Sequence, residues 1–390
     1  MRIAVEFDNY IKRRLYIIMS EALIVRRGNQ SSKSVIPAGG KTYGIAINTN
    51  NGVVTYIDDA EGFSPMTYGT TLNYGSWQDE IVNFFGCRPC FYRNGYSPIY
   101  LDPNDYTKTE SGETVNWSTG DVMVEFKRTW YKYSLDNYIL KFEVSNYDRS
   151  DDGFVSTAFI SLDDSGDIKD YMYYGAYNTV EGRSLSGRTF QYASDRNTVI
   201  SSCKRAPGYG LEDWVRLCYI MGLIMLVSKS TNPSSSSLFG SGPSGNTSIS
   251  TGLANKYGLF GKSSTVTKCF GIENLWQNNA YTMCDGIKID NLGTISVKIC
   301  SYGDGNAYSV YNICHSNSYG YLDGTPLIMM PVLDGAAIIP IDTSAATASP
   351  WGVRVRFNIR GVIYPGLDGL GPFSLFCGNS NAAFGRLIIV

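Results

Sequence analysis

Apolar and polar residues alternate over short stretches in the first part of the chain, a pattern typical of half-buried β-strands. The alternation is regular over residues 120–133 and 138–144, so we expect these stretches to pair as a hairpin. Before them, Asn48-Thr-Asn-Asn-Gly52 is a strong signal for a hairpin turn. Residues 146–153 are polar and rich in turn formers, and they mark the domain boundary that the sequence predicts.

The helical patterns lie in the second part of the chain. Residues 211–227 are apolar nearly all round, which predicts a buried helix. A shorter helix is expected over residues 194–205, where a Pro-Gly pair follows and would stop it. Residues 230–251 are rich in Ser, Gly, Pro and Asn and are predicted to form a loop. From Thr265 onward the pattern predicts short strands joined by turns.

This order of elements predicts an α+β, β-rich fold whose helices are segregated from its strands. The length of 390 residues favours two or three domains. We expect a β-rich domain over residues 19–150. A second domain, over residues 151–390, would carry two helices and a twisted antiparallel sheet.

Composition narrows the classes of function. The formal net charge is −2, from 33 basic and 35 acidic residues, which leaves no electrostatic footprint for nucleic acid. The longest apolar run, residues 217–227, is too short to span a membrane, so we expect a soluble protein that does not insert. The chain has 29 Tyr and 41 Gly, which suit a sheet with many turns and also the residue chemistry of binding surfaces.

The nine cysteines show no repeated metal-ligand spacing. Cys87-Arg-Pro-Cys90 is a single CxxC without a second pair or a nearby histidine, so we expect reduced and mostly buried thiols. Reduced thiols fit assembly in a cytoplasm. The sequence predicts no cofactor.

A polar segment near residue 273 stands out because it follows an apolar strand pattern. Buried carboxylates and amides are costly without partners, so we expect these side chains to satisfy one another in a structural knot. A Ca²⁺ site at four of them is the alternative, because clustered oxygen ligands suit a hard cation. The predicted knot consists of Glu273, Asn274, Trp276, Asn278 and Asp285, and all but Trp276 are the possible Ca²⁺ ligands.

Catalysis has little support in the sequence. His315 is the single histidine, so Ser-His-Asp or Cys-His chemistry would depend on it, and no G-x-S-x-G elbow accompanies it. Glycan cleavage would need two carboxylates facing a cleft. Most of the available carboxylates precede Gly, which is ordinary turn chemistry, so we expect no enzymatic activity. The available carboxylates are Glu273, Asp285, Asp304, Asp323, Asp334 and Asp368.

Candidate ligand-binding residues lie in the last third of the chain, where aromatic anchors and guanidinium groups of the kind enriched at hot spots occur together. Alternation over residues 354–360 places several of them on one strand face, which is either a binding face or a solvated outer face of a sheet. The first set is Trp351, Arg354, Arg356, Asn358, Arg360 and Tyr364. The second set is Phe373, Phe376, Asn379 and Asn381.

Several motifs in order carry a resemblance to a known group of proteins. Phe270-Gly-Ile-Glu-Asn-Leu-Trp276 resembles a signature of the C-type-lectin-like fold, which formylglycine-generating enzymes share. With residues 100–108, 120–125, 173–177 and 183–187, it resembles phage tail fibre and prophage tail-tip proteins of gut bacteria. These proteins are related to the major tropism determinant and to variable proteins of diversity-generating retroelements.

The resemblance implies a C-type-lectin-like ligand-binding domain over residues 151–390 and an attachment and trimerisation domain over residues 19–150. Met19 begins a segment that looks like the opening of tail proteins, so we expect residues 1–18 to be an N-terminal extension from an upstream start codon. Trp276-Gln-Asn278 departs from the usual Trp-Gly-Asn. Formylglycine-generating activity lacks its cysteine pair, since Cys377 stands alone in the last 76 residues. The C-terminal residue types do not indicate active diversification.

We therefore expect a phage tail receptor-binding protein, an adhesin that recognises a bacterial surface glycan or protein. Its expected partners are that cell-surface receptor, other phage tail proteins and two further copies in a homotrimer. Its expected location is the virion tail, after assembly in the bacterial cytoplasm. The alternatives are a tail-associated glycan-degrading enzyme and a structural tail subunit without a receptor.

Overall fold

The computed structural model divides the chain into two compact units, residues 1–35 and 36–390, and the residues it describes belong to the second. In residues 287–329 and 340–384 the structure describes only the backbone of the strands. The description omits residues 50, 164, 191–195, 234, 236, 241, 244–248, 277–280, 284, 286, 292–294, 300–308, 314–320, 345–354, 359–374, 377–382 and 385.

A four-stranded antiparallel sheet with the order β2-β1-β10-β9 forms one part of the fold. The predicted turn at Asn48 is confirmed, since the amides of Asn51 and Gly52 both donate to the Asn48 carbonyl. The strand expected over residues 120–133 is wrong in its length, because the chain leaves one sheet after Lys127 and enters this one at Trp130. The strands are β1 Thr42–Asn48, β2 Val54–Asp58, β9 Trp130–Asp136 and β10 Ile139–Ser145.

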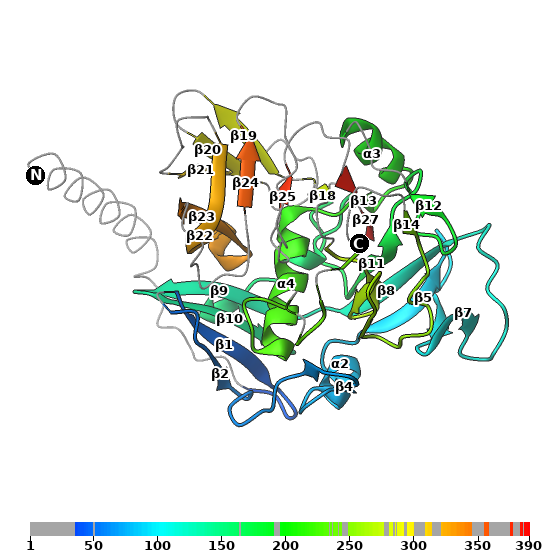
Figure 1. Ribbon diagram of the computed structural model, residues 1–390, viewed down its shortest axis with the longest axis horizontal. Helices are drawn as coiled ribbons and strands as arrows, with labels where there is room; N and C mark the ends of the chain where they lie inside the picture. Colours follow the sequence, from blue (N-terminus) through cyan, green and yellow to red (C-terminus); the bar gives the residue numbers. More distant parts are fainter. Residues whose placement is uncertain are drawn as a thin grey trace, which may run out of the picture. The chain divides into compact units, whose positions relative to one another are not determined.

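A seven-stranded sheet has the order β13-β27-β11-β8-β5-β6-β7, and its neighbouring strands are antiparallel (Figure 1). The last strand of the chain, β27, lies between β13 and β11 rather than at an edge. The strands are β5 Arg88–Tyr92, β6 Ile99–Asp102, β7 Asp105–Thr109, β8 Asp121–Lys127, β11 Tyr171–Asn178, β13 Tyr209–Leu211 and β27 Arg386–Ile389.

This sheet crosses the domain boundary that the sequence predicts near residue 150. Strand β8 precedes that boundary and pairs with β11, which follows it, over Tyr171–Gly175. Residues 36–390 accordingly form one compact unit. The polar turn at residues 146–153 is present as a short 3₁₀ helix, η1 Ser150–Asp152, but it separates two sheets of one unit and not two domains.

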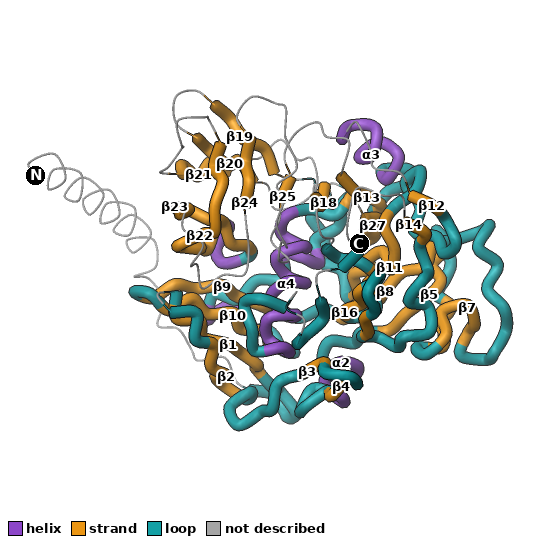
Figure 2. The backbone as a smooth tube through the Cα atoms, in the orientation of Figure 1, coloured by secondary structure: helices purple, strands orange, loops and turns teal. Residues whose placement is uncertain are grey.

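Shorter sheets make up the remaining strands. In the described chain most regular elements are strands, drawn in orange in Figure 2. Short strands follow Thr265 in the part of the chain that the structure describes, as expected, but Tyr321–Val332 and Ala337–Ser344 are longer strands of 12 and 8 residues. Two further 3₁₀ helices are η2 Thr157–Phe159 and η3 Leu333–Gly335. The strands are β3 Thr67–Tyr68, β4 Leu72–Asn73, β12 Thr189–Phe190, β14 Ile249–Ser250, β15 Gly261–Lys262, β16 Thr267–Cys269, β17 Ile272–Glu273, β18 Tyr281–Met283, β19 Ile287–Asn291, β20 Ile295–Ile299, β21 Ser309–Ile313, β22 Tyr321–Val332, β23 Ala337–Ser344, β24 Val355–Asn358, β25 Leu375–Phe376 and β26 Ala383–Phe384.

The helices that the structure describes are α2 Gln78–Asn83, α3 Arg196–Cys203 and α4 Trp214–Ser228. Both predicted helices are present, and α4 is buried along its whole length as expected. It begins at Trp214 and not at Leu211, because Asp213 caps it by accepting a hydrogen bond from the Arg216 amide. Within the described residues, no helix is long and apolar enough to cross a membrane. The fold is therefore β-rich with few helices and antiparallel sheets, as the sequence predicts at that level.

Helix α4 packs against both the four-stranded sheet and β23. The Tyr133 hydroxyl of β9 donates to the Cys218 carbonyl at 2.8 Å, and the Trp214 indole donates to the Ile338 carbonyl at 3.0 Å. Gly222 lies where α4 meets the sheet. A Cβ atom there would lie 2.5 Å from the ring of Phe142 and 2.6 Å from the Tyr133 hydroxyl.

We expect Gly222→Ala to destabilise the protein by about 1–2 kcal/mol, although alanine is favoured over glycine within a helix by about 1 kcal/mol. The added methyl group has no space against Phe142, and overpacking a core outweighs the gain in helix propensity. Urea unfolding followed by circular dichroism measures the change. Gly69→Ala is the control, because nothing lies within 4 Å of a Cβ atom at that position. A Gly222→Ala variant more stable than wild type would contradict the packing described here.

Candidate functional site

The ligand-binding residues predicted from the sequence are only partly within the described chain. Arg356 and Asn358 lie on β24, opposite Asp323 and Tyr321 of β22, and Phe376 lies on β25. Their binding role stays a prediction. Those outside the described residues are Trp351, Arg354, Arg360, Tyr364, Phe373, Asn379 and Asn381, and the single histidine, His315, is also outside them.

The predicted knot is built differently from the expectation. The Glu273 carboxylate accepts hydrogen bonds from the amides of Gly252 and Ala254, at 3.0 and 2.8 Å. The Asn274 side chain accepts from the Thr267 amide, and the Trp276 indole donates to the Gly240 carbonyl. These side chains are buried and partnered as predicted, but their partners are main-chain groups of other segments rather than one another.

One member of the predicted knot has other partners, and one lies outside the described residues. Asp285 lies beside the start of α4, where its amide donates to the Glu212 carbonyl and its carbonyl accepts from the Trp214 amide. Asn278 lies outside the described residues. The Ca²⁺ site considered at these oxygen ligands stays a prediction. Among the described residues, no group of three His, Cys, Asp or Glu side chains could hold a metal ion.

Lys268 completes the polar group around Glu273. It lies directly opposite Glu273 on the paired strands β16 and β17, and its ammonium group donates to the Ala254 carbonyl at 2.9 Å. The ammonium nitrogen is 3.4 Å from the centroid of the Tyr106 ring. Burial lowers the pKa of Lys268 to about 7, while the nearby Glu273 opposes that shift. The cross-strand pair of Glu273 and Lys268 therefore holds Ala254 at two points. Glu273 binds its amide and Lys268 binds its carbonyl.

The five cysteines in the described chain are free and buried, as the sequence predicts. Cys87 and Cys90 belong to separate hydrophobic clusters, so the CxxC does not bring its two thiols to one site. Burial raises the pKa of both thiols, which makes them poor nucleophiles.

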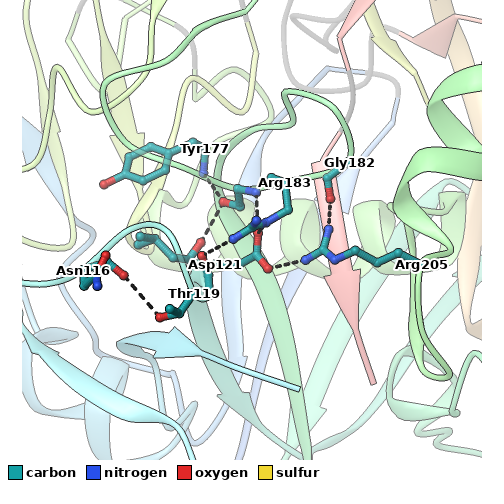
Figure 3. Close-up of polar contacts among 10 residues, drawn as sticks. Asn116, Thr119, Asp121, Tyr177, Gly182, Arg183 and Arg205 are labelled. Carbon is teal, nitrogen blue, oxygen red and sulfur yellow. Dashed lines mark hydrogen bonds and ion pairs between the residues drawn. The ribbon is translucent and has the colours of Figure 1, made fainter. Parts of the chain in front are cut away.

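Figure 3 shows a second polar group, centred on Asp121 at the start of β8. The guanidinium groups of Arg183 and Arg205 both donate to its carboxylate, and so does the Ser184 amide at 2.9 Å. Arg205 also donates to the Gly182 carbonyl. These contacts tie the segment after α3 and the turn at Gly182 to the start of β8, the central strand of the seven-stranded sheet, which is a structural role.

An open pocket of about 450 Å³ lies next to the segment that Lys268 and Glu273 hold. We call it the tyrosine pocket. Its walls come from the β3–β4 hairpin, the β6–β7 turn, the segment that follows Ala254, and β15. The residues that line it are Tyr68, Tyr74, Asn104, Lys256, Tyr257, Gly258 and Lys262.

Local contacts fix the position of each wall. The Asn104 amide donates to the Asp102 side chain at 2.8 Å, which shapes the tight turn between β6 and β7. The Tyr257 side chain lies against Gly261, where a Cβ atom would approach it to 2.5 Å, so glycine leaves room for the ring. The Tyr74 ring meets Phe260 edge to face at 6.0 Å.

Lys262 holds the β3 wall in place. Its ammonium group donates to the carbonyls of Tyr68 and Leu238 at 2.8 and 2.7 Å. The same group lies 4.6 Å from the centroid of the Tyr68 ring. Burial lowers the pKa of Lys262.

The tyrosine pocket is lined by three tyrosine rings, one amide and two lysine side chains. Binding sites for small polar ligands combine aromatic walls with a few polar groups in this way. The pocket could not be predicted from local sequence patterns, because its residues come from three separate parts of the chain. The predicted knot was the one indirect signal, since its Glu273 positions the segment that carries Lys256 and Tyr257.

Comparison with known proteins gives no match: no protein-family model, no curated protein and no solved structure is significantly similar to this chain.

Proposed function

We propose that this protein is a phage tail receptor-binding protein that recognises a bacterial surface glycan, and that the tyrosine pocket is one of its binding sites. The resemblance of its ordered sequence motifs to phage tail fibre proteins suggests the biological role. The observation that carries the glycan assignment is the grouping of Tyr68, Tyr74 and Tyr257 around an open pocket.

The chemistry of the pocket suits a sugar. A tyrosine ring offers a flat apolar surface to the C–H face of a pyranose and a hydroxyl group to its polar edge. Asn104 is exposed and can both donate to and accept from sugar hydroxyls. The rings are rigid, so little conformational entropy is lost on binding. Several copies on one virion would multiply a weak affinity at each site.

The finer architecture is part of the same proposal. A C-type-lectin-like arrangement of α3, α4 and the antiparallel strands would display the C-terminal residues predicted to bind. Under this proposal Arg354, Arg356, Asn358 and Arg360 would form a second contact region of the receptor site. Trimer formation and attachment to other tail proteins also belong to the proposal.

We expect Tyr257→Ala to weaken glycan binding by roughly tenfold or more, because truncating an aromatic anchor commonly costs over 1 kcal/mol. The test uses the full chain, since the seven-stranded sheet takes strands from both halves and a fragment of residues 151–390 would lack β5–β8. Labelled protein is applied to an array of bacterial surface polysaccharides, and the affinity for each bound polysaccharide is then measured.

Tyr138→Ala is the matched control, because Tyr138 is 57 % exposed and does not line the pocket. Unchanged affinity in Tyr257→Ala would remove the pocket from the binding site. Failure to bind any polysaccharide on the array would contradict the proposed function, and release of new reducing ends would favour the glycan-degrading alternative.

A further inference from the structure

Two lysines give the tyrosine pocket its charge. Lys262 is fixed in the wall, and its two partners described above are main-chain carbonyl groups, which carry no formal charge. Lys256 also lines the pocket, and its side chain is 76 % exposed.

The carboxylate nearest to Lys256 belongs to Asp105, and the pair is a loose one. The distance from the Lys256 nitrogen to the Asp105 oxygen is 3.9 Å, longer than a hydrogen bond. The other Asp105 oxygen accepts from both the amide and the hydroxyl of Thr107, at 3.1 and 2.6 Å. Asp105 is thus held by Thr107, while the solvated Lys256 is free to turn toward a ligand.

We propose that the tyrosine pocket selects an acidic sugar, one that carries a carboxylate or a phosphate group. The sugar ring lies against Tyr257, and the acidic group accepts a charge-assisted hydrogen bond from Lys256. This inference rests on the proposed glycan-binding function and names the class of ligand.

The test compares three oligosaccharides with the same backbone: a neutral one, one with a carboxylate and one with a phosphate. Their affinities for the full chain are measured by titration calorimetry at low and high salt. We expect either acidic oligosaccharide to bind about three- to tenfold more tightly than the neutral one at low salt, and this preference to shrink at 1 M salt, where the screening length falls to about 3 Å. The two acidic arms show which group the pocket prefers.

Variants separate the charge from the ring. Lys256→Ala should abolish the preference for the acidic oligosaccharides, whereas Lys256→Arg should keep it. Lys169→Ala is the matched control, because Lys169 is an exposed lysine that pairs with Asp167 at 3.3 Å elsewhere on the protein. Tyr257→Ala should weaken all three ligands.

The outcomes distinguish this inference from the function on which it rests. Equal affinities for the neutral and acidic oligosaccharides, or a preference that survives Lys256→Ala, would overturn the inference and leave glycan binding intact. If the protein binds none of the three oligosaccharides and no polysaccharide on the array, both the inference and the proposed glycan-binding function are overturned.

Discussion

Replacing Arg386 with methionine is expected to destabilise the protein at pH 8 by about 3–5 kcal/mol, because Glu212 is ionised at that pH and the change leaves its buried carboxylate and several carbonyl groups without their partner. Arg386 lies on β27 and is completely buried. Its guanidinium group donates to the carbonyls of Gly175, Glu273 and Asn274. Glu212, which is also completely buried, is the acidic group whose charge acts on it.

The Arg386 side chain therefore joins three parts of the fold. It connects the last strand to β11 through Gly175 and to the Glu273 group that supports the tyrosine pocket. A methionine side chain has a similar length but no hydrogen-bond donors. It would therefore fill the same space, while the three carbonyl groups would lose their donor. Urea unfolding should show a lower midpoint with an unchanged slope.

Three variants make the test specific. Arg128→Met is the control, since Arg128 pairs with Asp170 at the surface, where loss of an ion pair costs less than about 1 kcal/mol. Arg386→Lys should lie between Arg386→Met and wild type, because an ammonium group keeps the charge but does not span three carbonyls. The double variant Arg386→Met/Glu212→Gln should recover part of the loss, since it removes the unpaired charge. An Arg386→Met variant as stable as Arg128→Met would contradict the role assigned to Arg386.

Glu212 should make the stability of the protein fall as pH rises toward neutrality. Burial raises the pKa of Glu212 to about 7 from its ordinary value of 4.5. The charge of Arg386 and a hydrogen bond from Tyr174 oppose this rise, whereas the charge of Asp213 reinforces it. The folded protein thus holds this proton more tightly than the unfolded chain does. The stabilising contribution is complete below pH 4.5 and is lost as pH rises through 7, and it amounts to roughly 3 kcal/mol.

Glu212→Gln should remove this dependence, because the amide resembles the protonated acid and does not ionise. We expect the variant to match wild type near pH 5 and to be roughly 3 kcal/mol more stable at pH 8. Free energies of unfolding measured in urea from pH 4 to 8 give the difference curve. Glu61→Gln, at an exposed position, serves as the control. A difference curve for Glu212→Gln that is flat over this range would show that Glu212 does not titrate as proposed.

Local patterns in the sequence were sufficient for several elements. The turn at Asn48 follows from its turn-forming residues, and the burial of α4 follows from its apolar residues on all sides. The short strands after Thr265 follow from short alternating stretches. The burial of Glu273 and Trp276 was also predictable, since polar residues directly after an apolar strand must find partners. These properties depend on neighbours a few residues away, which is the range over which sequence patterns carry information.

Pairing between distant segments was decided by tertiary structure alone. Nothing near residue 150 indicates that β8 and β11 pair across it, and nothing near Arg386 indicates that it reaches the carbonyl of Glu273, more than 100 residues earlier. The tyrosine pocket likewise assembles Tyr68, Asn104 and Tyr257 from separate parts of the chain. A sequence determines which side chains must be buried or partnered, whereas only the folded chain determines which distant groups become those partners, because strand pairing uses main-chain hydrogen bonds that are the same for every residue.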